Sequence, residues 1–97
     1  MAQVPAPTGP DVRRWLVTGA SRGIGHAIAA LAASRGDKVC LVGRDPGIAD
    51  VAAAIGGEAF GLAADVTKSG DPDRIAAEIY ARWGGIDVVV NNAGLHR

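Results

Sequence analysis

Residues 18–25 read Thr-Gly-Ala-Ser-Arg-Gly-Ile-Gly (TGASRGIG) and stand between a short apolar run, residues 15–17, and a stretch with helical spacing. Gly19 permits a sharp exit from a strand, Gly23 removes the Cβ that would keep a phosphate from the backbone, and Gly25 lets the next helix pack closely on a sheet. The free N–H groups and positive dipole end of that helix favour an anion. The stretch therefore predicts a strand, turn and helix that together bind a phosphate group.

The spacing GxxxGxG distinguishes this turn from other phosphate-binding loops. It differs from the GxGxxG of many dinucleotide sites, and no Lys-Ser or Lys-Thr pair follows Gly25 as it would in a Walker A loop. We therefore do not expect phosphoryl transfer. A glycine-rich turn that binds nothing is the structural alternative, and the strand before the turn and helix after it favour binding.

The rest of the chain alternates short apolar runs with alanine-rich helical stretches, which is typical of βαβ units in a parallel sheet. Right-handed crossovers place the first two helices on one face and the third on the other if the strand order is 3-2-1-4. We expect strands at residues 15–17, 38–42, 58–64 and 86–90. We expect helices from the glycine turn to Arg35-Gly36, from residue 46 to about residue 55, and from an N-cap at Asp71 to Gly84.

Helical spacing also predicts which side chains face the sheet. In the first helix these are Ile24, Ala27, Ile28, Leu31 and Ala32, and in the third helix they are Ile75, Ala76, Ile79, Tyr80 and Trp83. Residues 1–12 carry three prolines and lack the pattern of a secretory signal, so we interpret them as a flexible lead. Residues 13–97 then form a single domain, the most that a chain of 97 residues allows.

Charge and cysteine usage exclude several classes of function. Ten basic residues balance ten acidic ones, so no overall field attracts a nucleic acid or an anionic membrane. The single cysteine, Cys40, excludes an internal disulfide and a cysteine-based zinc site, and it reads as a small buried hydrophobe. No apolar run is long enough to cross a bilayer. We expect a cytoplasmic protein with no nucleic-acid partner, no membrane partner and no metal.

Three motifs resemble those of the short-chain dehydrogenase/reductase family: TGASRGIG at residues 18–25, Asp65-Val66 after the third strand, and NNAG at residues 91–94. The resemblance implies an α/β fold, a partial Rossmann-type doubly wound parallel sheet of about four strands, that binds a nicotinamide dinucleotide. It implies that Thr18 and Asn91 tie the first strand to the fourth. The implied cofactor contacts are Gly19, Ser21, Arg22, Gly23, Ile24 and Gly25 at the pyrophosphate and adjacent ribose, Asp65 with Val66 at the adenine, and Asn92, Ala93 and Gly94 at the ribose and ring.

Read without the resemblance, two of these features keep simpler interpretations. Asp65 could cap a loop, and the pair Asn91-Asn92 could make a turn.

The residue at the end of the second strand selects between the two nicotinamide cofactors, because an acid there accepts from a free 2′-hydroxyl and repels a 2′-phosphate. In similar family members that acid falls on Gly43, so it is absent here. Arg44 follows, a planar cation suited to a phosphate, and Arg22 supplies a second cation. We predict NADP(H) over NAD(H), with the preference reversed if Asp45 rather than Arg44 faces the ribose.

The family's catalytic residues are a Ser and a Tyr-x-x-x-Lys unit that follow NNAG, and this chain contains neither. Tyr80 is the only tyrosine, Gly84 stands four positions later, and the helical stripe predicts that Tyr80 is a core residue. We therefore assign no catalytic residue and expect these 97 residues alone to be inactive.

The resemblance implies the cofactor-binding part of an oxidoreductase that interconverts a small-molecule carbonyl and an alcohol, and that is a homo-oligomer when complete. One alternative is a truncated, non-catalytic module that binds a nucleotide or a partner. The other is a nucleotide-binding epimerase or dehydratase of an extended relative.

Overall fold

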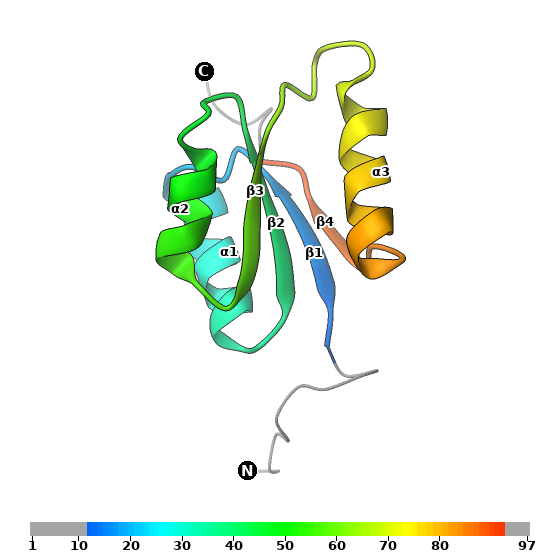
Figure 1. Cartoon of the computed structure of the whole chain (residues 1–97). Coiled ribbons are helices and arrows are strands. Elements are labelled where there is room, and N and C mark those ends of the chain that lie inside the picture. Colours follow the sequence, from blue (N-terminus) through cyan, green and yellow to red (C-terminus); the bar gives the residue numbers. More distant parts are fainter. Residues whose placement is uncertain (1–11, 93–97) are drawn as a thin grey trace.

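A computed structural model describes residues 12–92, which form four strands and three helices. Figure 1 shows the helices packed on both sides of the strands. The predicted lead therefore lies outside the described residues except for Val12. The elements in chain order are β1 (Arg14–Thr18), α1 (Gly23–Ser34), β2 (Lys38–Gly43), α2 (Ile48–Ile55), β3 (Glu58–Ala63), α3 (Asp71–Trp83) and β4 (Val88–Val90).

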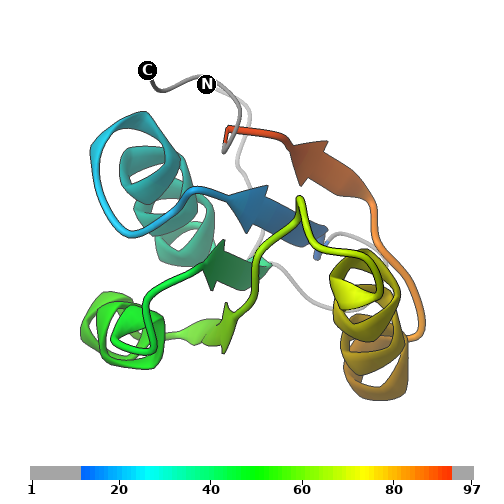
Figure 2. The same ribbon diagram turned by 90° about the horizontal axis from the view of Figure 1, so that it is seen from above.

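The four strands form one parallel sheet in the order β3-β2-β1-β4, which confirms the predicted topology. Helices α1 and α2 cover one face and α3 covers the other, as the view along the sheet in Figure 2 makes plain. Because all strands are parallel, their carboxyl ends meet at one edge of the sheet. The loops that leave those ends therefore gather in one place.

Strand β2 lies at the centre and is buried on both faces, as its unbroken apolar sequence predicts. Val39 and Leu41 join the cluster under α1 and α2, whereas Cys40 and Val42 join the cluster under α3. Burial raises the pKa of the Cys40 thiol to about 12, so this cysteine is a neutral core residue, as its sequence context predicts.

The predicted sheet-facing stripe of α1 is confirmed for Ile28, which packs against the core cluster, and for the buried Ala32, but it is wrong for Ile24, Ala27 and Leu31. Ile24 is 68% exposed, Leu31 is 63% exposed and Ala27 is also exposed, whereas the buried residues of the helix are Gly25, Ala29, Ala32 and Ala33. These small residues recur at helical spacing, so they form a smooth face that lets α1 approach the sheet closely. Hydrophobicity alone favoured the larger side chains, but at the closest approach to the sheet the buried residues of the helix are all Gly or Ala.

Helix α3 departs from prediction at two points. Tyr80 is 58% exposed and is not a core residue, while Ile75 and Ile79 are buried as predicted. Only one stripe of α3 contacts the sheet. Tyr80 follows Ile79 in the chain, so its side chain points in a different direction around the helix axis and lies outside that stripe. The N-cap is Gly70, in the left-handed conformation, so the helix begins at Asp71 and the Asp71 side chain does not cap it.

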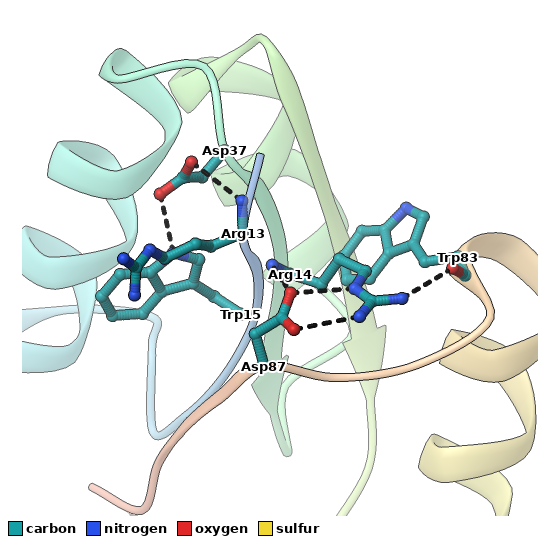
Figure 3. A network of polar contacts seen from close by, with 6 residues as sticks. All are labelled: Arg13, Arg14, Trp15, Asp37, Trp83 and Asp87. Atoms are coloured by element: carbon teal, nitrogen blue, oxygen red, sulfur yellow. Dashed lines mark hydrogen bonds and ion pairs between the residues drawn. The ribbon is translucent and has the colours of Figure 1, made fainter. Parts of the chain in front are cut away.

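Two carboxylates fasten the amino-terminal end of β1 (Figure 3). Asp37 is buried and accepts hydrogen bonds from the Arg13 backbone N–H at 3.2 Å and from Trp15 Nε1 at 2.9 Å. On the other side, Asp87 accepts from the backbone N–H, Nε and Nη2 of Arg14 at 2.8, 2.9 and 2.9 Å. Arg14 also donates to the Trp83 carbonyl, and the Asp87 N–H donates to the Arg14 carbonyl. The chain between α3 and β4 is thereby held against β1.

The Arg14–Asp87 pair predicts an acid-sensitive stability. Hydrogen bonds from the Arg14 side chain and backbone lower the pKa of Asp87 from 3.8 to about 2. A carboxyl whose pKa is lower in the folded state stabilises the fold above its unfolded pKa and loses that contribution as the pH falls through its folded pKa. We therefore expect Asp87 to contribute stability above about pH 4 and to lose it progressively toward pH 2.

Urea unfolding between pH 2 and pH 6 measures this contribution. Asp87→Asn should lower the unfolding midpoint at pH 6 and flatten its dependence on pH between about 4 and 2. Arg14→Gln, which keeps the carboxyl but removes its partner, should also lower the midpoint at pH 6. An Asp87→Asn profile parallel to that of the parent chain would contradict the assignment.

Candidate nucleotide-binding site

A pocket of about 450 Å³ lies at the carboxyl edge of the sheet. It is lined by the loop between β1 and α1, the end of β2, the loop that follows β3, and Asn92, which lies two positions after the end of β4. Its lining residues are Thr18, Gly19, Ser21, Arg22, Gly23, Ile24, Val42, Gly43, Arg44, Ala64, Asp65, Val66, Thr67 and Asn92.

Most residues predicted from the sequence to bind a cofactor line this one pocket. They are Gly19, Ser21, Arg22, Gly23, Ile24, Arg44, Asp65, Val66 and Asn92. Gly25 lies behind the lining and not in it, and Ala93 and Gly94 lie outside the described residues. Sequence reasoning did not assign Val42, Gly43, Ala64 or Thr67 to the binding surface. Gly43, Ala64 and Thr67 each adjoin an assigned residue, and Val42 precedes Gly43 in β2, so proximity to the assigned residues is the signal that would have found them.

The turn after β1 has the backbone that its glycines predict. Gly19 has φ +60° and Gly23 has φ +68°, values in the left-handed region that residues with a side chain rarely adopt. No described residue other than glycine has a positive φ. Both glycines are therefore required by the path of the chain, whatever the turn binds.

Gly25 is required by a close contact behind the turn. A Cβ at this position would lie 2.5 Å from the Gly19 carbonyl oxygen and 2.8 Å from Asn92 Nδ2. Those two atoms are themselves hydrogen-bonded, with Asn92 Nδ2 donating to the Gly19 oxygen at 3.0 Å. Close packing at Gly25 was predicted against the sheet, and the close partners are instead Gly19 in the turn and Asn92 after the end of β4.

Thr18 joins β1 to the segment after β4. Its hydroxyl oxygen accepts the Asn92 backbone N–H at 2.9 Å and lies 3.3 Å from Asn91 Oδ1 and 3.4 Å from the Val90 carbonyl oxygen. Thr18 and Asn91 thus tie the two strands as expected. The two strands flank the point where the chain reverses its order across the sheet, which is where ligands bind in folds of this class.

The amino-terminal end of α1 faces the pocket, and no side chain of the helix neutralises the positive end of its dipole. No side chain caps this end, and the first turn of the helix contains no acidic residue. By contrast, the first turn of α3 contains Asp71 and Asp73. The uncapped N–H groups and the positive end of the α1 dipole therefore favour an anion at the turn.

Asp65 is the acidic residue of the pocket lining, and it is already engaged in the loop. Its Oδ1 accepts from the Thr67 backbone N–H and the Thr67 hydroxyl, which is the loop-capping role that its sequence position allowed. The hydroxyl bond is the first cause of a lowered pKa for Asp65, followed by the backbone bond. Arg44 also lowers the pKa electrostatically. The carboxyl is therefore an ionised acceptor at neutral pH.

The adjacent residues Arg44 and Asp45 have different surroundings. Arg44 lines the pocket, whereas Asp45 does not. The Asp45 Oδ1 accepts the Gly47 backbone N–H at 2.8 Å and so closes the turn that leads into α2. The pocket lining thus contains two cations, Arg22 and Arg44, and one carboxylate.

The described residues 12–92 contain no cluster of three or more His, Cys, Asp or Glu side chains placed to hold a metal ion. Within the same residues, no helix has both the length and the apolar character needed to cross a membrane.

Comparison with known proteins decides the family. The family model for short chain dehydrogenases matches residues 13–97. The chain belongs to the short-chain dehydrogenase/reductase family. A sorbitol dehydrogenase from Cereibacter sphaeroides is 42% identical over 86 residues, which cover 88% of this chain and 34% of that protein. Carbonyl reductase family member 4 from Xenopus tropicalis is 41% identical over 81 residues, which cover 84% and 34%.

Solved structures agree. A short-chain dehydrogenase from Streptomyces avermitilis superimposes with a TM-score of 0.79 at 42% identity, covering 90% of this chain and 32% of that one. The chain thus spans about a third of the length of the short-chain dehydrogenase/reductase relatives it matches.

Membership of the short-chain dehydrogenase/reductase family implies a nicotinamide dinucleotide as cofactor. The pocket fits such a molecule on three grounds. The turn has glycines at positive φ where it borders the pocket, the α1 terminus is uncapped, and the two lining arginines carry positive charge.

Gly25→Ala tests the contact behind the turn. Its Cβ would collide with the Gly19 carbonyl, so the turn or Asn92 must shift, at a cost of about 1–3 kcal/mol that outweighs the helix propensity gained. We expect a lower thermal unfolding midpoint and nucleotide binding at least about tenfold weaker by fluorescence titration. Ala27→Ser, which adds one heavy atom at an exposed position of the same helix, is the matched control. Unchanged binding by Gly25→Ala would show that the turn tolerates the contact.

Proposed function

We propose that this chain forms the NADP(H)-binding part of an oxidoreductase that interconverts a carbonyl and an alcohol by hydride transfer. The observation that carries the proposal is the glycine turn at the carboxyl edge, joined to Asn92 and open to a pocket of about 450 Å³. Family membership supports the reaction class. A bound nicotinamide dinucleotide supplies or accepts the hydride.

The turn binds the pyrophosphate in this proposal. The backbone of residues 21–24 presents N–H groups, and the α1 dipole adds about 0.3–1 kcal/mol for an anion. Arg22, exposed in the same turn, adds a cation that phosphate oxygens can accept from. Gly25 acts indirectly, by leaving room for Asn92 to hold the Gly19 carbonyl.

The two ends of the dinucleotide lie to either side of the turn in this proposal. Asp65 and Val66 meet the adenine, where the ionised Asp65 carboxylate accepts from the adenine amino group. Asn92, with Ala93 and Gly94 after it, meets the ribose and the nicotinamide ring. Asn92 is supported in this role by its two hydrogen bonds to β1 and the turn, which restrict the position of its side chain.

The cofactor is NADP(H) rather than NAD(H) in this proposal. Arg44 lines the pocket at the end of β2, and Gly43 brings no acid to compete for the ribose. The nearest acid in the chain, Asp45, is occupied by the Gly47 N–H outside the pocket lining. This supports the interpretation in which the 2′-phosphate meets a guanidinium, and not a carboxylate that would repel it.

These residues bind and orient, and the proposal assigns them no proton transfer. Reduction of a carbonyl needs a proton donor within hydrogen-bond reach. Tyr80 is exposed on α3 and is not a lining residue of the pocket, so it is no candidate. We propose that the family's Ser and Tyr-x-x-x-Lys unit supplies this step and that the 97 residues alone bind without turnover.

Two further parts of the proposal concern the cellular compartment and the oligomeric state. The lone thiol Cys40 is buried and unpaired, which suits a reducing cytoplasm. The complete enzyme is proposed to be a homo-oligomer that acts on a small-molecule carbonyl or alcohol.

Arg44→Asp tests the choice of cofactor. A charge-assisted contact corresponds to about a ten- to hundredfold preference, so the variant should lose that much affinity for NADPH and only a few-fold for NADH. Titration of the full chain with both cofactors measures the two dissociation constants. Arg35→Asp makes the same charge change at the exposed carboxyl end of α1 and should leave both dissociation constants unchanged. Equal losses for NADPH and NADH in Arg44→Asp would remove the argument for NADP(H).

A further inference from the structure

The loop between β3 and α3 is held in place by a side chain that the binding motifs do not include. Asp71, the first residue of α3, was expected to cap its own helix, but its Oδ2 instead accepts the backbone N–H of Asp65 at 2.9 Å. The bond reaches back over six residues to the acidic residue of the pocket lining. Asp71 therefore acts on the loop before the helix rather than on the helix itself.

Asp71 is in turn held by Arg74, one turn further along α3. Arg74 Nη2 lies 3.6 Å from Asp71 Oδ1 and donates to the carbonyl oxygen of Ala63 at 3.0 Å. Ala63 ends β3, so the arginine connects the helix, the carboxylate and the strand end. The side chain of Asp71 is 24% exposed, which limits competition from water for these contacts.

The other groups of Asp65 are engaged as well, with one exception. Its carbonyl accepts the Lys68 N–H at 2.9 Å, and its Oδ1 accepts from Thr67. Its Oδ2 accepts no hydrogen bond from any residue between 12 and 92. With the backbone fixed by Asp71 and one carboxylate oxygen fixed by Thr67, the remaining oxygen has a restricted position beside the pocket.

We infer that Asp71 is a positioning residue for recognition of the purine: it holds the Asp65 backbone so that the Asp65 carboxylate meets the base. The inference rests on the proposed function, because it assumes that the pocket binds an adenine dinucleotide. It goes beyond that function by assigning base selectivity to a residue outside the pocket lining.

The experiment compares NADPH with its hypoxanthine analogue, which replaces the amino group of adenine by an oxygen. Wild-type chain should prefer NADPH by about tenfold, since an ionised acceptor meets a donor in one case and an oxygen in the other. Asp71→Ala should reduce that preference to about twofold or less. Asp71→Asn, which keeps an acceptor oxygen for the Asp65 N–H, should restore most of it.

Two further variants separate positioning from stability. Asp73→Ala removes the same charge from the first turn of α3 without touching the loop, so its base preference should match the wild type. If Asp71→Ala does not fold, Arg74→Gln tests the same role, because it removes the cation beside Asp71 Oδ1 and should also lower the preference.

The outcomes are distinct. Wild-type chain that binds NADPH and discriminates against the analogue, with an Asp71→Ala variant that discriminates equally well, overturns the positioning role alone. Wild-type chain that binds NADPH but does not discriminate also overturns it. Wild-type chain that binds neither nucleotide overturns the proposed function. A loss of preference shared by Asp73→Ala would assign the effect to the helix terminus and not to Asp71.

Discussion

The carbonyl oxygen of Gly19 is the point on which the site depends. It accepts a hydrogen bond from the side-chain amide of Asn92, 73 residues away in the chain, and a Cβ on Gly25 would lie only 2.5 Å from it. Three segments thus meet at one atom: the turn after β1, the start of α1 and the end of β4. Their close approach keeps the backbone N–H groups of the turn and the Asn92 side chain at the same pocket.

The short pairing of β1 with β4 is fastened at both ends by polar contacts. Only three register pairs join the strands. At the carboxyl end, the Thr18 hydroxyl accepts the Asn92 N–H, and at the amino end, Arg14 binds Asp87 through its backbone and its guanidinium. Such a short ladder does little to orient an edge strand by itself, so these bonds decide where Asn92 lies. The acid-sensitive pair therefore supports the site from the far end of the strand.

Charged residues close in the chain have separate roles in structure and in binding. Arg44 lines the pocket while Asp45 closes a turn, and Asp65 lines the pocket while Asp71 holds its backbone. The carboxylates of Asp45 and Asp71 each accept a backbone N–H, and neither residue lines the pocket. The positive character of the site thus results from where the acids are used, in a chain whose formal net charge is zero.

The sequence by itself determined the parallel order of the strands, the turn after β1 and most of the pocket lining, because these follow from local requirements: glycine at positive φ and loops at strand ends. Tertiary structure decided the rest. Ile24, Leu31 and Tyr80 are exposed although they occur at helical spacing with other apolar residues. The distance between a helix and the sheet determines which side chains fit between them. Likewise, Asp71 bonds to Asp65 rather than capping α3, since the path of the intervening loop brings the Asp65 N–H within its reach.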